Sequence, residues 1–161
     1  MQDQLARAIE FRTAKRYDEA RRLFAELYEA YPDDPLVNYH YAWLHDSLGE
    51  ESGAVPFYER AINLGLPDEE LRGAMLGLGS TYRALGEYEK SVDLLRRGMA
   101  RFPDAGEFPV FLAMALYNSG VHAEAMELLL KTLANTSNDE GIRRFQRAIE
   151  FYADKLDEVW P

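Results

Sequence analysis

Small side chains recur along the chain at a nearly constant spacing, within segments whose apolar positions have helical spacing. One series is separated by 34, 37 and 34 residues and consists of Ala8, Ala42, Gly79 and Ala113. A second series has the same three spacings and consists of Ala20, Ala54, Ser91 and Ala125. Small residues let two helices approach closely, and a period near 34 is typical of stacked helix-turn-helix units. The pattern therefore predicts an all-α repeat protein.

The clearest copy of the repeat lies between Leu78 and Pro103. Its recurring residues are Leu78, Gly79, Tyr82, Gly86, Tyr88 and Pro103. They resemble the motif of the tetratricopeptide repeat (TPR) family, which has Leu-Gly, Tyr, Gly, Tyr and Pro at these places. The resemblance covers about residues 1 to 139, and the chain is similar to small stand-alone bacterial TPR proteins. It implies a right-handed α-solenoid of about four repeats with a C-terminal capping helix.

The spacing divides the chain into four repeats within a single domain, 1–161. We expect the repeats at 1–34, 35–71, 72–105 and 106–139, followed by a capping helix at 139–159. Three additional residues fall around 64–70, which predicts one further turn on the first helix of the third repeat. Arg7, His45 and Thr132 depart from the family's motif.

The expected capping helix carries an apolar stripe with intervals of 3, 4, 3, 4 and 3 residues: Ile142, Phe145, Ile149, Tyr152, Leu156 and Val159. A stripe of this kind marks the buried face of an amphipathic helix. We therefore expect the helix to cover the open end of the solenoid. Phe151 and Trp160 lie off the stripe, and the pattern does not explain them.

Composition limits the partners that the chain can bind. Lysine and arginine number 18, against 28 aspartates and glutamates, so the formal net charge is −10. This excess repels phosphate backbones and anionic lipid, and it argues against nucleic-acid or membrane-surface binding. No stretch approaches the roughly 20 apolar residues that span a bilayer, and no export signal is recognisable. We expect a cytoplasmic protein, with which the absence of cysteine agrees.

The sequence offers no convincing catalytic or metal-binding constellation. His40 and His45 are five residues apart, whereas a spacing of four would align two ligands on one helix face. Paired acids such as Glu69 and Glu70 lie at expected helix starts, where the helix dipole favours negative charge. Neither a cysteine nor a Gly-x-Ser-x-Gly turn is present to supply a nucleophile. We predict no enzymatic activity, no metal and no cofactor.

The family resemblance implies that the first helix of each repeat lines a concave groove. Carried over position by position, the candidate groove residues are Arg12, Tyr39, Trp43, Leu76, Arg83, Met114 and Tyr117. Large apolar and aromatic residues of this kind are common at interaction sites, and Arg12 and Arg83 can meet an acidic group on a ligand. The alternative is that these side chains belong partly to the core.

One subtype of the family grips a peptide's terminal carboxylate with Lys and Asn residues. The comparable positions here hold Leu5, Ile9, His40, Gly73 and Gly77, so that clamp is absent. The leading hypothesis is a non-enzymatic module that binds a segment of a partner protein in the groove. Two alternatives remain: a self-associating structural module that uses Phe151 and Trp160, and a dedicated chaperone for an export substrate. The sequence leaves the partner and the oligomeric state open.

Overall fold

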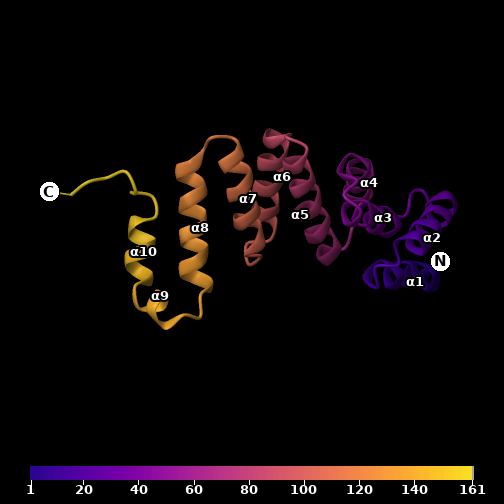
Figure 1. Cartoon of the computed structure of the whole chain (residues 1–161), viewed down its shortest axis with the longest axis horizontal. Helices are drawn as coiled ribbons and strands as arrows, with labels where there is room; N and C mark the ends of the chain where they lie inside the picture. The colour runs from indigo at the N-terminus through magenta and orange to yellow at the C-terminus, as the bar shows by residue number, and fades with distance from the viewer. Residues whose placement is uncertain (161) are drawn as a thin grey trace. The chain divides into compact units, whose positions relative to one another are not determined.

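The computed structural model describes residues 1–160, which form ten α-helices and no strand (Figure 1). The prediction of an all-α fold is confirmed. The helices fall into two compact units, Met1–Gly86 and Glu87–Pro161. We describe each unit by itself.

The first unit consists of two helical hairpins and one further helix: α1 (Gln2–Thr13), α2 (Tyr17–Ala30), α3 (Pro35–Ser47), α4 (Glu51–Leu64) and α5 (Asp68–Ala84). Each helix packs against the next one in the sequence, and α3 also contacts both α1 and α5. The odd-numbered helices therefore share one side of the unit, while α2 and α4 form the other layer.

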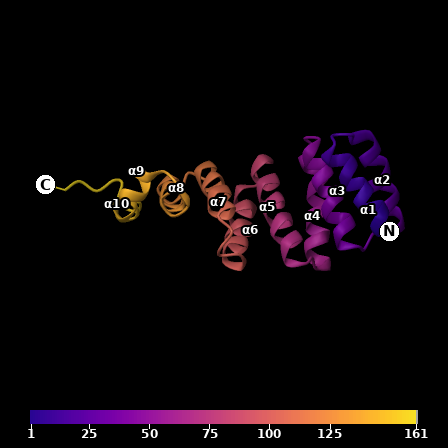
Figure 2. The same ribbon diagram turned by 90° about the horizontal axis from the view of Figure 1, so that it is seen from below.

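The second unit contains one long hairpin flanked by other helices: α6 (Tyr88–Arg101), α7 (Glu107–Asn118), α8 (His122–Thr136), α9 (Glu140–Arg144) and α10 (Gln146–Tyr152). Helix α7 packs against both α6 and α8. Helix α10 lies beside α8 in both views (Figures 1 and 2).

The small residues that define the repeat are buried at the helix contacts. Both series lie in the core, and Ala8, Ala20, Ala42, Ala54 and Ser91 have no solvent exposure at all. Close approach in the second unit also depends on Gly98, because a Cβ there would overlap the ring of Phe108. The sequence prediction that these positions set the distance between helices agrees with this packing.

A left-handed residue follows each of the helices α1, α3, α5 and α7. Gly49, Gly86 and Gly120 have φ of 71°, 79° and 79°, and Lys15 occupies the equivalent place with φ of 57°. These four positions are again 34, 37 and 34 residues apart. Glycine adopts this conformation without steric cost, whereas Lys15 does not.

The three-residue insertion lengthens α5, as the sequence predicted. Helix α5 has 17 residues, whereas α1 has 12, α3 has 13 and α7 has 12. The preceding loop contains Gly65 at φ of 91°, which ends α4, and Pro67 as the N-cap of α5. Asp68, Glu69 and Glu70 occupy the first turn, where they complement the helix dipole.

The expected capping helix at 139–159 is wrong in its extent, whereas α10 does pack against α8, the last helix of the repeats. The helix breaks at Phe145 into α9 and α10 and ends at Tyr152. Polar interactions join this segment to α8: Asn135 contacts Gln146, and Lys131 interacts electrostatically with Asp154. Of the apolar stripe, Ile142 and Ile149 are half-buried, whereas Phe145, Tyr152, Leu156 and Val159 remain exposed.

Among residues 1–160, no helix is both long enough and apolar enough to cross a membrane.

Candidate functional site

Three helices of the first unit bring a cationic and aromatic group of side chains together. We call this group the α3 cluster and define it as Arg12 of α1, Tyr39, His40, Trp43 and Asp46 of α3, and Tyr58 of α4. Its rings are in contact: the Tyr39 centroid lies 5.8 Å from that of Trp43 and 6.3 Å from that of Tyr58. The helical spacing of Tyr39, Trp43 and Asp46 places them on one face of α3.

Arg12 is the charged centre of the α3 cluster. Its guanidinium carbon lies 3.9 Å from the centroid of the Trp43 ring, which is a cation–π contact. Nη1 donates to the His40 carbonyl oxygen at 3.3 Å and lies 3.4 Å from His40 Nδ1. Among the described residues no carboxylate contacts it, although only 7% of the residue is exposed. A buried cation without an anionic partner is unusual, because burial of charge is costly.

His40 is neutral in the folded protein. Burial, together with the positive charge of Arg12, lowers the pKa of His40 from 6.5 to about 4. A neutral imidazole can accept a hydrogen bond at Nδ1, which suits the neighbouring Arg12 donor. Burial likewise lowers the pKa of Arg12, but an arginine remains protonated at neutral pH.

A polar network closes the inner end of the α3 cluster. Tyr58 donates its hydroxyl hydrogen to Asp46 Oδ2 at 2.7 Å, and Thr81 of α5 donates to Asp46 Oδ1 at 3.0 Å. Burial raises the pKa of Asp46, although these two hydrogen bonds act in the opposite direction. The network fixes α3, α4 and α5 relative to one another within the unit.

Glycines on α5 leave space for the two tyrosines. A Cβ at Gly73 would overlap the Tyr39 hydroxyl oxygen, and a Cβ at Gly77 would lie 2.6 Å from the Tyr58 hydroxyl oxygen. The glycines therefore allow α5 to pass close to α3 and α4. Gly73 and Gly77 therefore serve helix packing, and both lie inside α5.

The structure brings together only part of the predicted groove set. Arg12, Tyr39 and Trp43 are in contact, with Trp43 44% exposed and Tyr39 buried. Leu76 and Arg83 are half-buried on α5 of the same unit. Tyr117, 64% exposed, and Met114 lie on α7 in the second unit. The expectation of one groove shared by all seven residues stays a prediction.

Sequence reasoning left His40, Asp46 and Tyr58 outside the final set of site residues. Asp46 shares the helical face of Tyr39 and Trp43, so its spacing was a usable signal. The contacts of His40 with Arg12 and of Tyr58 with Asp46 join different helices. The spacing of residues within one helix does not indicate these contacts between helices.

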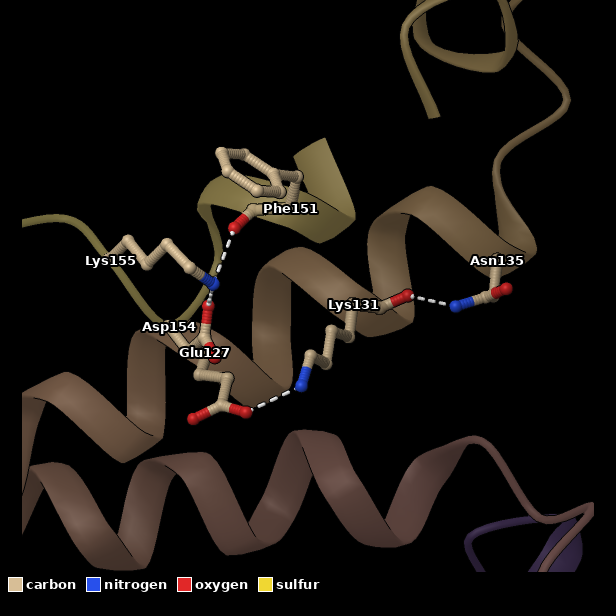
Figure 3. Close-up of polar contacts among 6 residues, drawn as sticks. All are labelled: Glu127, Lys131, Asn135, Phe151, Asp154 and Lys155. Carbon is tan, nitrogen blue, oxygen red and sulfur yellow. Dashed lines mark hydrogen bonds and ion pairs between the residues drawn. The ribbon is translucent and has the colours of Figure 1, made fainter. Parts of the chain in front are cut away.

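The second unit carries a different surface beside the end of α10. Glu127 and Lys131 form an ion pair on α8 at 2.5 Å, and Lys155 donates to the Phe151 carbonyl oxygen and to Asp154 (Figure 3). Phe151, Tyr152 and Trp160 contact one another, with the Tyr152 and Trp160 centroids 5.3 Å apart. All three rings are about half exposed.

Residues 1–160 contain no group of three or more His, Asp or Glu side chains that could hold a metal ion.

The tandem hairpins, with a small buried residue and a left-handed turn residue at matching places, define a helical-repeat protein. The chain belongs to the tetratricopeptide repeat family. A model described as "Tetratrico peptide repeat" matches residues 35–156, and one described as "Tetratricopeptide repeat" matches residues 2–44. Repeats of this family are generally protein–protein interaction modules, and proteins built from them are typically non-enzymatic scaffolds. No curated protein matches the chain.

Solved structures share the fold at low sequence identity. A chain in "Crystal structure of APC/C hetero-tetramer Cut9-Hcn1" is 16% identical with a TM-score of 0.75, and the match covers 91% of our chain but only 29% of that chain. "MamA RS-1 ArsTM double mutant" is 15% identical with a TM-score of 0.75, over 97% and 86% of the two chains. A thermophilic TPR protein of Thermus thermophilus, TTC0263, is 20% identical over 93% and 98%, with a TM-score of 0.44. At identities this low, the first two of these structures show the fold alone.

Proposed function

We propose that the chain is a non-enzymatic interaction module that binds an extended or helical segment of a partner protein at the α3 cluster. The observation that carries this proposal is the pairing of the exposed Trp43 with the buried, counter-ion-free Arg12. Trp and Arg are the residues most enriched at energetic centres of protein interfaces. Tyr39 and its neighbours hold both side chains in place.

The chemistry of the α3 cluster favours a particular kind of segment. A carboxylate on the segment would supply the anion that Arg12 lacks, and charge-assisted hydrogen bonds of this type are stronger than neutral ones. The half-exposed Trp43 ring offers an adjacent surface for an apolar or aromatic side chain. The preferred segment therefore has one acidic residue close to a large apolar residue. Leu76 and Arg83, on α5 of the same unit, are the proposed continuation of the groove.

The test selects peptides from a random displayed library with the full chain and measures the affinity of the enriched sequences. We expect Trp43→Ala to weaken binding at least about tenfold, which is a typical loss at an interface hot spot. Tyr31→Ala is the matched control, because Tyr31 is a comparably exposed aromatic residue of the same unit outside the α3 cluster. Circular dichroism verifies that both variants remain folded.

Equal affinities for Trp43→Ala, Tyr31→Ala and the unmodified chain would contradict the proposal. Enriched peptides without an acidic residue would contradict the role given to Arg12. The narrower alternative of an export chaperone requires a substrate that is unstable without this chain. A partner that stays folded and soluble alone would exclude that alternative while leaving segment binding intact.

A further inference from the structure

The outer side of the first hairpin forms a groove with a basic lining. It has a volume of about 330 Å³ and lies between α1 and α2. Phe11 and Leu23 contribute its apolar surface, and the guanidinium carbons of Arg7 and Arg16 lie 5.3 and 4.5 Å from the Phe11 ring centroid. We call this surface the basic groove.

The second unit has a groove of the opposite character. It has a volume of about 510 Å³ and lies between the first turns of α8 and residues 153–158. Met126 and Leu156, 44% and 53% exposed, provide its apolar surface. Five acidic residues line it: Glu124, Glu127, Asp154, Asp157 and Glu158. We call this surface the acidic groove.

Both grooves contain charged side chains that form no ion pair within the chain, in addition to others that do. In the acidic groove, Glu124 pairs with Arg96 and Asp154 with Lys155, while Glu127 pairs with Lys131 (Figure 3). Asp157 and Glu158 form no ion pair within residues 1–160.

The basic groove has unpaired positive charge. Arg16 is paired with Glu19, whereas Arg7 and Arg22 form no ion pair in the described part of the chain. Glu26 is the remaining acid that lines the basic groove. Two unpaired guanidinium groups therefore outnumber the one unpaired carboxylate.

We infer that copies of this chain associate head to tail, with the basic groove of one copy bound to the acidic groove of the next. The unpaired charges of the two grooves are opposite, and each groove also has apolar side chains among its lining residues. Opposite charges across an interface favour encounter and fix its orientation. A contact between two acidic grooves would instead bring like charges together. The chemistry therefore favours a heterologous contact over a symmetric one.

A head-to-tail contact has a structural consequence that a symmetric dimer lacks. After one such contact each copy has one groove left, and copies can add until a ring of two or more closes or a filament grows. The association also depends on salt, because its charged groups lie on the surface. The α3 cluster takes no part in the contact, so this inference is independent of the proposed function.

The experiment is sedimentation velocity on the full chain over a range of concentrations, at about 50 mM and about 500 mM salt. We expect mass beyond the monomer at high concentration and weaker association at high salt. The double variants Arg7→Glu/Arg22→Glu and Asp157→Lys/Glu158→Lys should each associate at least about tenfold more weakly, because exposed ion pairs contribute modestly and repulsion replaces them. A mixture of the two variants should associate again, because the reversed groove of one variant then meets the reversed groove of the other with opposite charges.

The matched control is Glu89→Lys/Asp104→Lys, which changes the net charge by the same amount as the acidic-groove variant at exposed sites outside it. It should associate at least as well as the unmodified chain. A chain that stays monomeric at every concentration would overturn the inference. So would association that Arg7→Glu/Arg22→Glu leaves unchanged, because the interface would then lie elsewhere, for example at Phe151 and Trp160. Circular dichroism confirms that each variant is folded.

Discussion

At the scale of single residues, the left-handed turn positions show how closely the conformation follows the repeat. Gly49, Gly86 and Gly120 adopt positive φ without strain, and Lys15 adopts it at the cost of crowding its Cβ. The residue at this position therefore adopts a left-handed backbone conformation in every repeat, even where it is a lysine.

Gly49→Ala should lower the free energy of unfolding by about 1 kcal/mol, because a Cβ at φ of 71° is strained even though no atom lies near it. The measurement is chemical denaturation followed by circular dichroism. Gly106→Ala is the control: Gly106 has φ of −62° and equally open surroundings. Lys15→Gly should instead raise the free energy of unfolding, because glycine adopts positive φ without strain. Equal stabilities of Gly49→Ala and Gly106→Ala would contradict the explanation.

His40 should make the folded state less stable as the pH falls. Its pKa is about 4 when folded and 6.5 when unfolded, so between these values the unfolded chain binds a proton that the folded chain does not. The penalty is absent above pH 6.5 and grows to at most about 3 kcal/mol near pH 4.

The measurement compares stability against pH for the unmodified chain and for His40→Gln, which cannot titrate at this position. The substitution alters contacts and so lowers stability at neutral pH, and the difference between the two curves should narrow as the pH falls. The raised pKa of Asp46 acts in the opposite direction but is common to both proteins. Parallel curves from pH 7 to 4 would show that His40 is not buried in a neutral form.

At the scale of helices, features that depend on local sequence were predicted correctly, whereas those that depend on packing between distant segments were not. The length of α5 follows from a three-residue insertion, so counting residues was enough to predict it. The end of the chain was predicted less well, because the spacing of apolar residues indicates that a helix has a buried face but not what that face meets. Here α8 presents Lys131 and Asn135, and only Ile142 and Ile149 of the stripe are half-buried.

Helices α9 and α10 should therefore open locally well before the first unit unfolds. Neither contains a buried residue, whereas α3 contains five. Segments with little apolar burial exchange their amide hydrogens through local openings that cost much less free energy than global unfolding. Hydrogen exchange measured by mass spectrometry should show early labelling at 140–152 and late labelling at 37–44. Equal protection of both segments would indicate that α10 is held by contacts other than those described.

At the scale of the whole molecule, the single domain predicted from the sequence contains two compact units. The first unit has a core of its own, composed of Leu5, Ala8, Ala20, Phe24, Leu27, Val37 and Leu44. In repeat proteins most contacts join neighbouring repeats, so part of an array can be stable by itself.

Residues 1–86, produced alone, should fold into a helical unit with a cooperative thermal transition. The reason is that α1 to α5 already contain both this core and the Asp46 network. Far-ultraviolet circular dichroism during heating provides the measurement. An unfolded fragment would instead support one cooperative domain over 1–161.

The sequence by itself determined the repeat, the positions of most helices, the turn residues and the small buried contacts. These features depend on interactions within a few turns of helix, so they leave a period in the sequence. Only the tertiary structure decided that Arg12 lies against Trp43, that His40 is neutral, and that the last helix breaks at Phe145. Each of these depends on contacts between different helices, and the distance and burial that control them are not encoded in any local pattern.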